Sequence, residues 1–127
     1  MSLMSIFKIF RVDEWRKFSQ AHIFTGSADD VRDGFIHFST EATLAGTLTK
    51  YFKDEAKIII AEVDNPKWGE HLKWEVSRGG ARFPHLYTAL YMDDVVGHWE
   101  LVQNTGQMWD LTSIAKACEI TFAPSDV

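Results

Sequence analysis

Residues 33–40, DGFIHFST, place His37 between aromatic and aliphatic residues and end on a hydroxyl pair. Residues 82–88, RFPHLYT, repeat this arrangement around His85. Side chains along a β-strand alternate between two faces. In an extended chain, each segment therefore carries an aromatic ring, its histidine and a hydroxyl on one face. The two segments predict neighbouring strands whose imidazoles line a common hollow with an aromatic floor.

A second interpretation of the two histidines stays open from the sequence alone. A strand histidine is often a core residue whose ring nitrogens bond backbone carbonyls. The repeated pattern favours a ligand pocket instead, because such pockets place a few polar groups on an apolar wall.

Composition and charge narrow the class of protein. A chain of 127 residues and 14.5 kDa predicts a single domain spanning residues 1–127. A net charge of −5 argues against a generic electrostatic interaction with nucleic acid. The apolar runs are too short to cross a membrane, and the chain does not begin with a signal-peptide pattern, so we expect a cytoplasmic protein. Cys118 is the single cysteine, which excludes an internal disulfide and a cysteine-based zinc cluster.

Hydrophobic periodicity predicts more strands than helices, without regular alternation between them. This order indicates an α+β fold with small, twisted, mostly antiparallel sheets and two or three helices. Residues 57–63, KIIIAEV, suit a central strand covered on both faces. The other expected elements are strands at 6–11, 34–39, 72–77, within 83–102 and at 119–123, helices from Asp13, over 41–53 and over 110–118, and polar loops at 25–34 and 78–82.

Three further features are candidates for ligand binding. Ser39 and Thr40 precede a predicted helix whose first N–H groups could seat an anion, although both hydroxyls could equally act only as caps. Arg78 and Arg82 flank a glycine pair, which predicts either an anion-binding loop or an ordinary solvated hairpin. Glu75 could orient a ribose hydroxyl or act as a base, or could form only a salt bridge.

Several familiar signatures are absent from the sequence. It contains no GxGxxG, GxxxxGK[ST], GxSxG or HExxH motif. A zinc site built from His37, His85 and Glu75 would have three of the four ligands that zinc prefers, so no metal site is predicted.

The succession DGFIHFST, LKWE and FPHLYTAL resembles the bacterial domain of unknown function 952 (DUF952) family over roughly residues 6–101, with residues 106–127 as a C-terminal extension. That family is similar in fold to the ADP-ribosyltransferases and the RNA 2′-phosphotransferases, which hold NAD or an ADP-ribosylated intermediate in a cleft between two small sheets. The resemblance therefore implies an ADP-ribosylation-like fold and NAD, or another nucleotide-like small molecule, as the ligand. It does not bring an established reaction.

The resemblance also implies roles for particular residues. His37 would anchor the adenosine ribose or the nicotinamide, and Tyr87 would stack on nicotinamide together with Trp74 or Phe83. Glu75 would be the catalytic glutamate, although that residue usually comes from a later strand, where Glu100 competes for the role.

Together these inferences define a candidate site and two candidate functions. The site comprises His37, Glu75 and His85 as catalytic residues, and Ser39, Thr40, Trp74, Arg78, Arg82, Phe83 and Tyr87 as ligand-binding residues. The first function is binding or transfer chemistry on NAD, ADP-ribose or a phosphorylated nucleotide, by an enzyme like an ADP-ribosyltransferase or a 2′-phosphotransferase. The alternative is a non-catalytic module that binds a small acidic metabolite or a protein partner.

Overall fold

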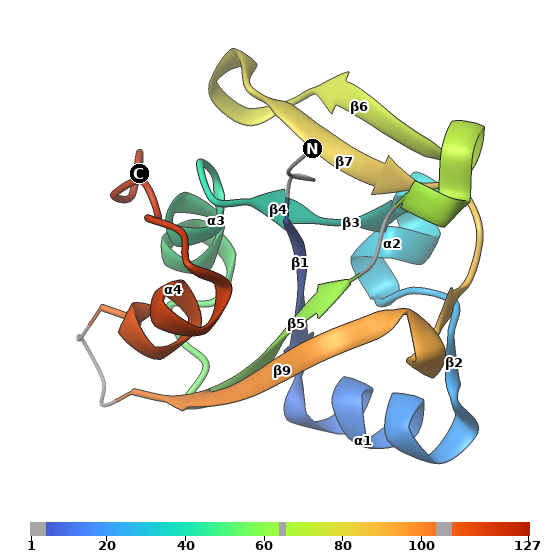
Figure 1. The fold of residues 1–127 in the computed structure, drawn as a ribbon, viewed down its shortest axis with the longest axis horizontal. Coiled ribbons are helices and arrows are strands. Elements are labelled where there is room, and N and C mark those ends of the chain that lie inside the picture. The colour runs from blue at the N-terminus through green and yellow to red at the C-terminus, as the bar shows by residue number, and fades with distance from the viewer. Residues whose placement is uncertain (1–4, 64–65, 104–107) are drawn as a thin grey trace.

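A four-stranded antiparallel sheet forms the centre of the computed structural model, which describes residues 5–63, 66–103 and 108–127 (Figure 1). Its strands lie in the order β4-β1-β5-β9. The bounds are Ile6–Arg11 for β1, Ser39–Thr40 for β4, Lys57–Val63 for β5 and Val95–Val102 for β9.

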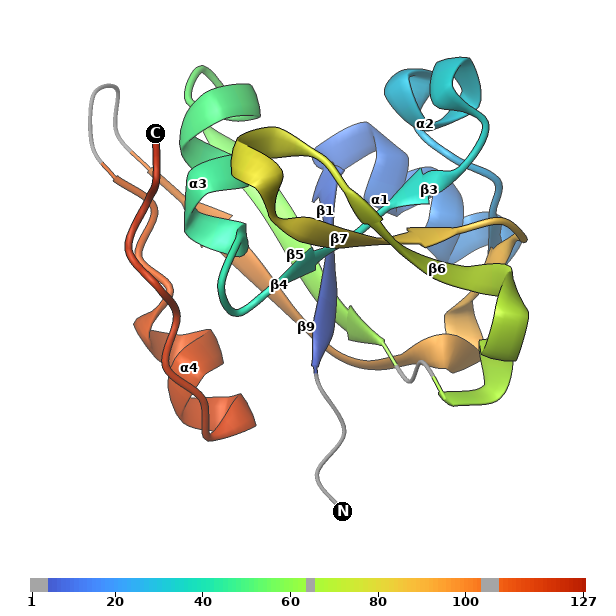
Figure 2. The ribbon, with the colours of Figure 1, turned by 90° about the horizontal axis from the view of Figure 1, so that it is seen from above.

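Strand β5 is buried on both faces, as its nearly unbroken apolar sequence predicts. Ile58 and Ile60 point into a core shared with helices α3 (Leu44–Tyr51) and α4 (Thr112–Cys118). Ile59 and Ala61 point the other way, into a core that contains residues of α1 (Val12–Ala21) and of a second sheet. The central sheet is therefore the middle layer of the fold (Figure 2).

The second sheet has three antiparallel strands in the order β3-β7-β6, with bounds Ile36–His37, Arg82–Leu86 and Leu72–Val76. A short pair, β2 (Ile23–Phe24) and β8 (Leu90–Tyr91), lies apart from it. These small antiparallel sheets confirm the predicted α+β class. Three 3₁₀ turns complete the described elements, at Pro66–His71, Arg78–Gly80 and Met92–Asp94.

The predicted single strand over residues 34–39 is wrong, because the chain changes sheet in its middle. His37 pairs with His85 in the second sheet, whereas Ser39 pairs with Phe7 in the central sheet. Between them, the backbone N–H of Phe38 donates to the carbonyl of Pro84 at 3.0 Å, and the Phe38 side chain is buried. The segment therefore joins the two sheets. The second part of this segment forms β4, which pairs with β1 at only two positions, Ile6 and Phe7.

The helices differ from the prediction in number and in their starting points. The described residues contain four α-helices rather than two or three. The predicted loop 25–34 contains α2, Ala28–Asp33, which begins at a capping box formed by Ser27 and Asp30 and ends at Gly34 with φ 88°. Ser-x-x-Asp before a glycine is a readable helix signal that the loop prediction overlooked.

Two predicted helix starts are also wrong. The residue preceding α1 is Arg11, and Asp13 lies inside the helix. Helix α3 begins at Leu44, after Thr43, so Ser39 and Thr40 do not cap it. Thr40 instead makes local bonds, accepting from the Ala42 N–H at 3.2 Å and donating its own N–H to Thr43 Oγ1 at 2.9 Å.

The described part of the C-terminal extension packs against the central sheet, while residues 106–107 lie outside the described chain. Helix α4 buries Ile114 completely, which confirms the helix predicted near residues 110–118. The strand predicted at 119–123 is not formed, and Phe122 packs on Phe7 with ring centroids 5.4 Å apart. None of the described helices has the length and hydropathy needed to span a bilayer.

Candidate functional site

The two histidines of the opening motifs meet across neighbouring strands. His37 on β3 and His85 on β7 are direct partners in the register, with ring centroids 5.5 Å apart. Phe35 stacks on His85 at 4.0 Å and lies 4.7 Å from His37 and 5.3 Å from Tyr87. The predicted convergence of two imidazoles on an aromatic floor is confirmed.

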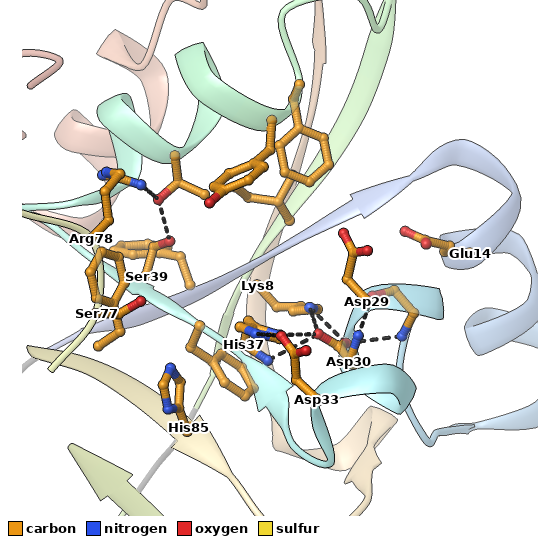
Figure 3. A pocket seen from close by; sticks show the side chains of 18 of the residues that line it. Lys8, Glu14, Asp29, Asp30, Asp33, His37, Ser39, Ser77, Arg78 and His85 are labelled. Carbon is orange, nitrogen blue, oxygen red and sulfur yellow. Dashed lines mark hydrogen bonds and ion pairs between the residues drawn. The ribbon is translucent and has the colours of Figure 1, made fainter. Parts of the chain in front are cut away.

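A cavity of about 210 Å³ lies beside this pair, between the two sheets (Figure 3). We call it the inter-sheet cavity. Strand β4 pairs with β1 only as far as Phe7, and no other strand of the described chain pairs with that edge of β1 beyond it. Lys8, Ile9 and Arg11 line the cavity there. Phe83 and His85 of β7 form part of the opposite wall. The change of sheet at Phe38 therefore produces both the wall and the opening.

One end of the cavity, here called the imidazole end, is built around a buried ion pair. Lys8 Nζ lies 2.9 and 3.2 Å from the two carboxylate oxygens of Asp30, and the two residues are 5 % and 2 % exposed. Asp30 Oδ1 is also 2.6 Å from His37 Nδ1, and the second ring nitrogen, Nε2, is 3.0 Å from Asp33 Oδ2. The His37 ring therefore lies between two carboxylates, and each of its nitrogens is within hydrogen-bond distance of one carboxylate oxygen.

Electrostatics keep both of these carboxylates ionised. Burial by itself would raise the pKa of Asp30, but the hydrogen bond from His37 and the charge of Lys8 outweigh it and hold the pKa far below its ordinary value. The hydrogen bond from Arg32, with a smaller contribution from His37, lowers the pKa of Asp33. The imidazole end therefore combines fixed negative charge with N–H donors.

His85 has a different environment from His37. Its Nδ1 lies 2.9 Å from Glu75 Oε1, which also accepts the Tyr87 hydroxyl at 2.6 Å. These two bonds, first that of Tyr87 and then that of His85, lower the pKa of Glu75. Desolvation lowers the pKa of His85, against the opposing effect of Glu75. Near neutral pH, Nδ1–H therefore donates to Glu75 and Nε2 keeps a free lone pair.

The other end, here called the arginine end, is built around Arg78 on the turn after β6. Its Nη1 donates to Thr47 Oγ1 at 3.0 Å, and the guanidinium lies 5.3 Å from the ring centroid of Phe83. Ser39 and Ser77 add hydroxyl groups, and Figure 3 shows both beside Arg78, at the opposite end from Asp30. An arginine among hydroxyls is a typical partner for phosphate or carboxylate oxygens.

Comparison with known proteins identifies the family. A family described as "Protein of unknown function (DUF952)" matches residues 9–98. The chain belongs to the DUF952 family. Its structure is similar to the crystal structure of protein CC0527 from Caulobacter crescentus, a structural-genomics target, with 38 % identity and a TM-score of 0.82 over 88 % of this chain and 98 % of that one. The solution NMR structure of the same protein gives a TM-score of 0.77, again at 38 % identity, over 88 % of this chain and 97 % of that one. A search of curated proteins gave no significant match.

Within the residues that the DUF952 family matches, the predicted site residues divide into two groups. His37, Ser39, Arg78, Phe83 and His85 line the inter-sheet cavity. The remaining predicted residues do not line it; they are Thr40, Trp74, Glu75, Arg82 and Tyr87.

Strand geometry explains why these residues lie outside the cavity. Glu75 and Tyr87 stand behind His85 and reach the cavity through its ring. Trp74 alternates with Glu75 along β6 and so faces the other side of the sheet, where Arg82 Nη1 donates to its carbonyl at 3.2 Å. Glu100, on the distant edge strand β9, pairs with Lys57.

Sequence reasoning missed Lys8, Asp30, Asp33 and Thr47. One signal for Lys8 was present, since the alternation of β1 puts it on the same face as Ile6 and Phe10, where a lysine needs a buried partner. Within the described ranges 5–63, 66–103 and 108–127, no group of three histidine, cysteine or acidic residues has an arrangement able to hold a metal ion.

Proposed function

We propose that the protein binds a small phosphorylated, nucleotide-like molecule in the inter-sheet cavity and that His85 and His37 transfer protons to and from it. The observation that carries this proposal is the pairing of two imidazoles with different carboxylate partners, with ring centroids 5.5 Å apart, in a cavity whose other end holds an arginine. An acceptor and a donor at that separation are the two groups that acid–base catalysis needs.

The walls of the cavity indicate the class of ligand. The Arg78 guanidinium, with Ser39 and Thr47, suits a phosphate or carboxylate group. The aromatic wall contributed by Phe38 and Phe83 suits a sugar or a ring. The volume of about 210 Å³ is below the range of about 300–1,000 Å³ that is usual for drug-sized ligands. The cavity therefore fits part of NAD or of ADP-ribose, or a smaller metabolite.

In this proposal the two histidines have distinct roles. His85 accepts a proton at Nε2, because Glu75 occupies Nδ1 and desolvation favours the neutral ring. His37 donates from Nε2 once a ligand oxygen replaces Asp33, whose side chain is 35 % exposed. Glu75 thus acts as a positioning residue for His85. The place of the cavity between two small sheets, together with the resemblance to ADP-ribosyltransferases, supports an ADP-ribosylation-like fold.

Calorimetric titration with NAD, ADP-ribose, AMP and inorganic pyrophosphate tests binding. We expect at least one of them to bind, with an affinity reduced about tenfold or more in Arg78→Ala, since a charge-assisted hydrogen bond contributes about 1.5–3 kcal/mol. His71→Gln is the matched control for His37→Gln and His85→Gln, because His71 is exposed and does not line the cavity. No heat with any of the four compounds at millimolar concentration would refute the proposal.

The non-catalytic module remains the second candidate, favoured by the two carboxylates that hold His37 as a fixed donor. Product analysis separates the two functions. If His85→Gln leaves affinity within about twofold but abolishes turnover of a bound nucleotide, the protein is an enzyme. If the unmodified protein binds that nucleotide and converts none of it, the protein is a binding module.

A further inference from the structure

We propose that the C-terminal arm, residues 123–127, competes with the ligand for the arginine end of the cavity. In this proposal the Asp126 carboxylate holds Arg78 in the free protein, and the anionic group of the ligand displaces it. The inference rests on the proposed function of the cavity and adds a means of regulation to it. Asp126 lies outside the residues that the DUF952 family matches.

Asp126 binds the side of the guanidinium that is best suited to an anion. Arg78 Nε lies 3.4 Å from Asp126 Oδ2, and Nη2 lies 3.0 Å from Oδ1. Arginine recognises carboxylate and phosphate groups through such a fork, in which two parallel N–H groups donate to two oxygens. The arm therefore presents the same chemistry as the ligand group that the arginine end would bind.

The donors of Arg78 are nearly exhausted while the arm is in place. A guanidinium has five N–H donors. Asp126 takes the Nε donor and one on Nη2, the Thr43 carbonyl lies 3.4 Å from Nη2, and Thr47 Oγ1 takes one on Nη1. A single donor, on Nη1, is left for a ligand. Displacement of Asp126 frees the Nε and Nη2 donors of the fork.

Two glycines shape the seat of the Asp126 carboxylate. A Cβ at Gly46 on α3 would overlap Asp126 Oδ1 and would lie 2.6 Å from Arg78 Nη2. A Cβ at Gly79, in the turn that carries Arg78, would lie 3.6 Å from Asp126 Oδ2. The carboxylate therefore occupies space that a side chain at residue 46 would fill.

The arm is held loosely enough to be displaced. Phe122 is anchored on Phe7, and the Ala123 N–H donates to the Glu41 carbonyl at 2.9 Å. Beyond Ala123, the polar contacts that the arm makes with the rest of the described chain are those of Asp126 with Arg78. The Asp126 side chain is 51 % exposed, whereas the Arg78 side chain is 12 % exposed. The carboxylate of the pair is therefore open to solvent, which screens and weakens its interaction with the guanidinium.

Titration of inorganic pyrophosphate into the unmodified protein and four variants tests the competition. We expect Asp126→Asn to bind pyrophosphate about 3–10-fold more tightly than the unmodified protein, as expected for the loss of a weak competing ion pair. Glu119→Gln makes the same change in charge at an exposed residue of the extension that does not touch Arg78, and should leave the affinity unchanged. In an Arg78→Lys background, Asp126→Asn should give no gain.

Nitrogen-15 relaxation of the Ser125, Asp126 and Val127 amides supplies an independent measurement. Pyrophosphate should increase the mobility of these amides in the unmodified protein, because the arm leaves Arg78 when the anion binds. If the unmodified protein and Asp126→Asn bind pyrophosphate equally, the arm proposal is overturned and the proposed function stands. Weaker binding by Asp126→Asn also overturns it, since Asp126 would then complete the site. Absence of pyrophosphate binding by every variant overturns the arm proposal, and it overturns the proposed function as well only if NAD, ADP-ribose and AMP also fail to bind.

Discussion

Replacement of Asp30 by asparagine should destabilise the protein far more than an ordinary polar substitution. The amide would keep the shape of the side chain but remove its charge. Lys8, whose side chain is 6 % exposed, would then be left as a buried cation without its counter-ion. Breaking one partner of a buried ion pair costs about 3–5 kcal/mol. That is a large share of the total of about 5–15 kcal/mol that is usual for a small domain.

Urea unfolding at pH 7 measures this cost, and the neighbouring residue provides the control. Asp29 is paired with Arg32 on the surface, with side chains 58 % and 68 % exposed, so Asp29→Asn should change the free energy of unfolding by less than about 0.5 kcal/mol. A double-mutant cycle with Lys8→Met should show a coupling of about 1–3 kcal/mol, because the double variant removes both charges. The reasoning is refuted if Asp30→Asn costs no more than Asp29→Asn, or if the two changes are additive.

The same carboxylate makes stability depend on pH in a defined direction. The pKa of Asp30 in the folded protein lies below its ordinary value of 3.8, so the unfolded chain binds a proton more readily. The stabilisation is fully present above about pH 5 and is lost as the pH falls below about 4. Asp30→Asn should remove the largest part of this acid dependence. The smaller part that comes from Asp33 should persist.

Three further outcomes are expected. Glu75→Gln should move the NMR titration of His85 to lower pH, since Glu75 opposes the desolvation that already lowers that pKa; an upward shift would contradict the proposed pairing. Burial raises the pKa of Cys118 to about 11, so at pH 8 the folded protein should have about a hundredfold less thiolate than the urea-unfolded chain. Ellman's reagent should therefore label Cys118 more slowly in the folded protein than in urea. Gly46→Ala should free the C-terminal arm, giving sharper Asp126 amide signals, whereas unchanged signals would contradict the seat described above.

The alternation of side chains along a strand was enough to predict which residues surround His37 and His85. Alternation alone put Phe35 with His37 on one face of their strand and His85 with Tyr87 on one face of theirs, and pairing of the two strands places all four on the same face of the sheet. The apolar run of β5 likewise determined its central place. Such features depend on the local repeat of the chain, which the sequence carries directly.

Local sequence patterns gave wrong predictions at residues 38–40, where a helix-cap pattern and a strand pattern overlap. The hydroxyls of Ser39 and Thr40 resemble helix caps, yet these two residues form β4, which pairs with β1. Phe38 looks like the middle of a strand, yet it is the point where the chain passes from one sheet to the other. The chain changes sheet here because the Phe38 side chain is buried and its backbone N–H donates to the Pro84 carbonyl. Both interactions are with residues far away in the sequence, so no local pattern signals them.

The charges that surround the histidines were decided only by the tertiary structure. Lys8 and Asp30 are 22 residues apart, and Arg78 and Asp126 are 48 apart. No periodic pattern links such residues, because their partners are set by which strand edge stays open and which elements pack over it. The sequence by itself determined that each histidine shares a strand face with an aromatic ring and a hydroxyl group, and it left open whether the two faces meet. Only the folded chain determined which carboxylate holds each ring, because Asp30, Asp33 and Glu75 reach the imidazoles through the packing of other elements.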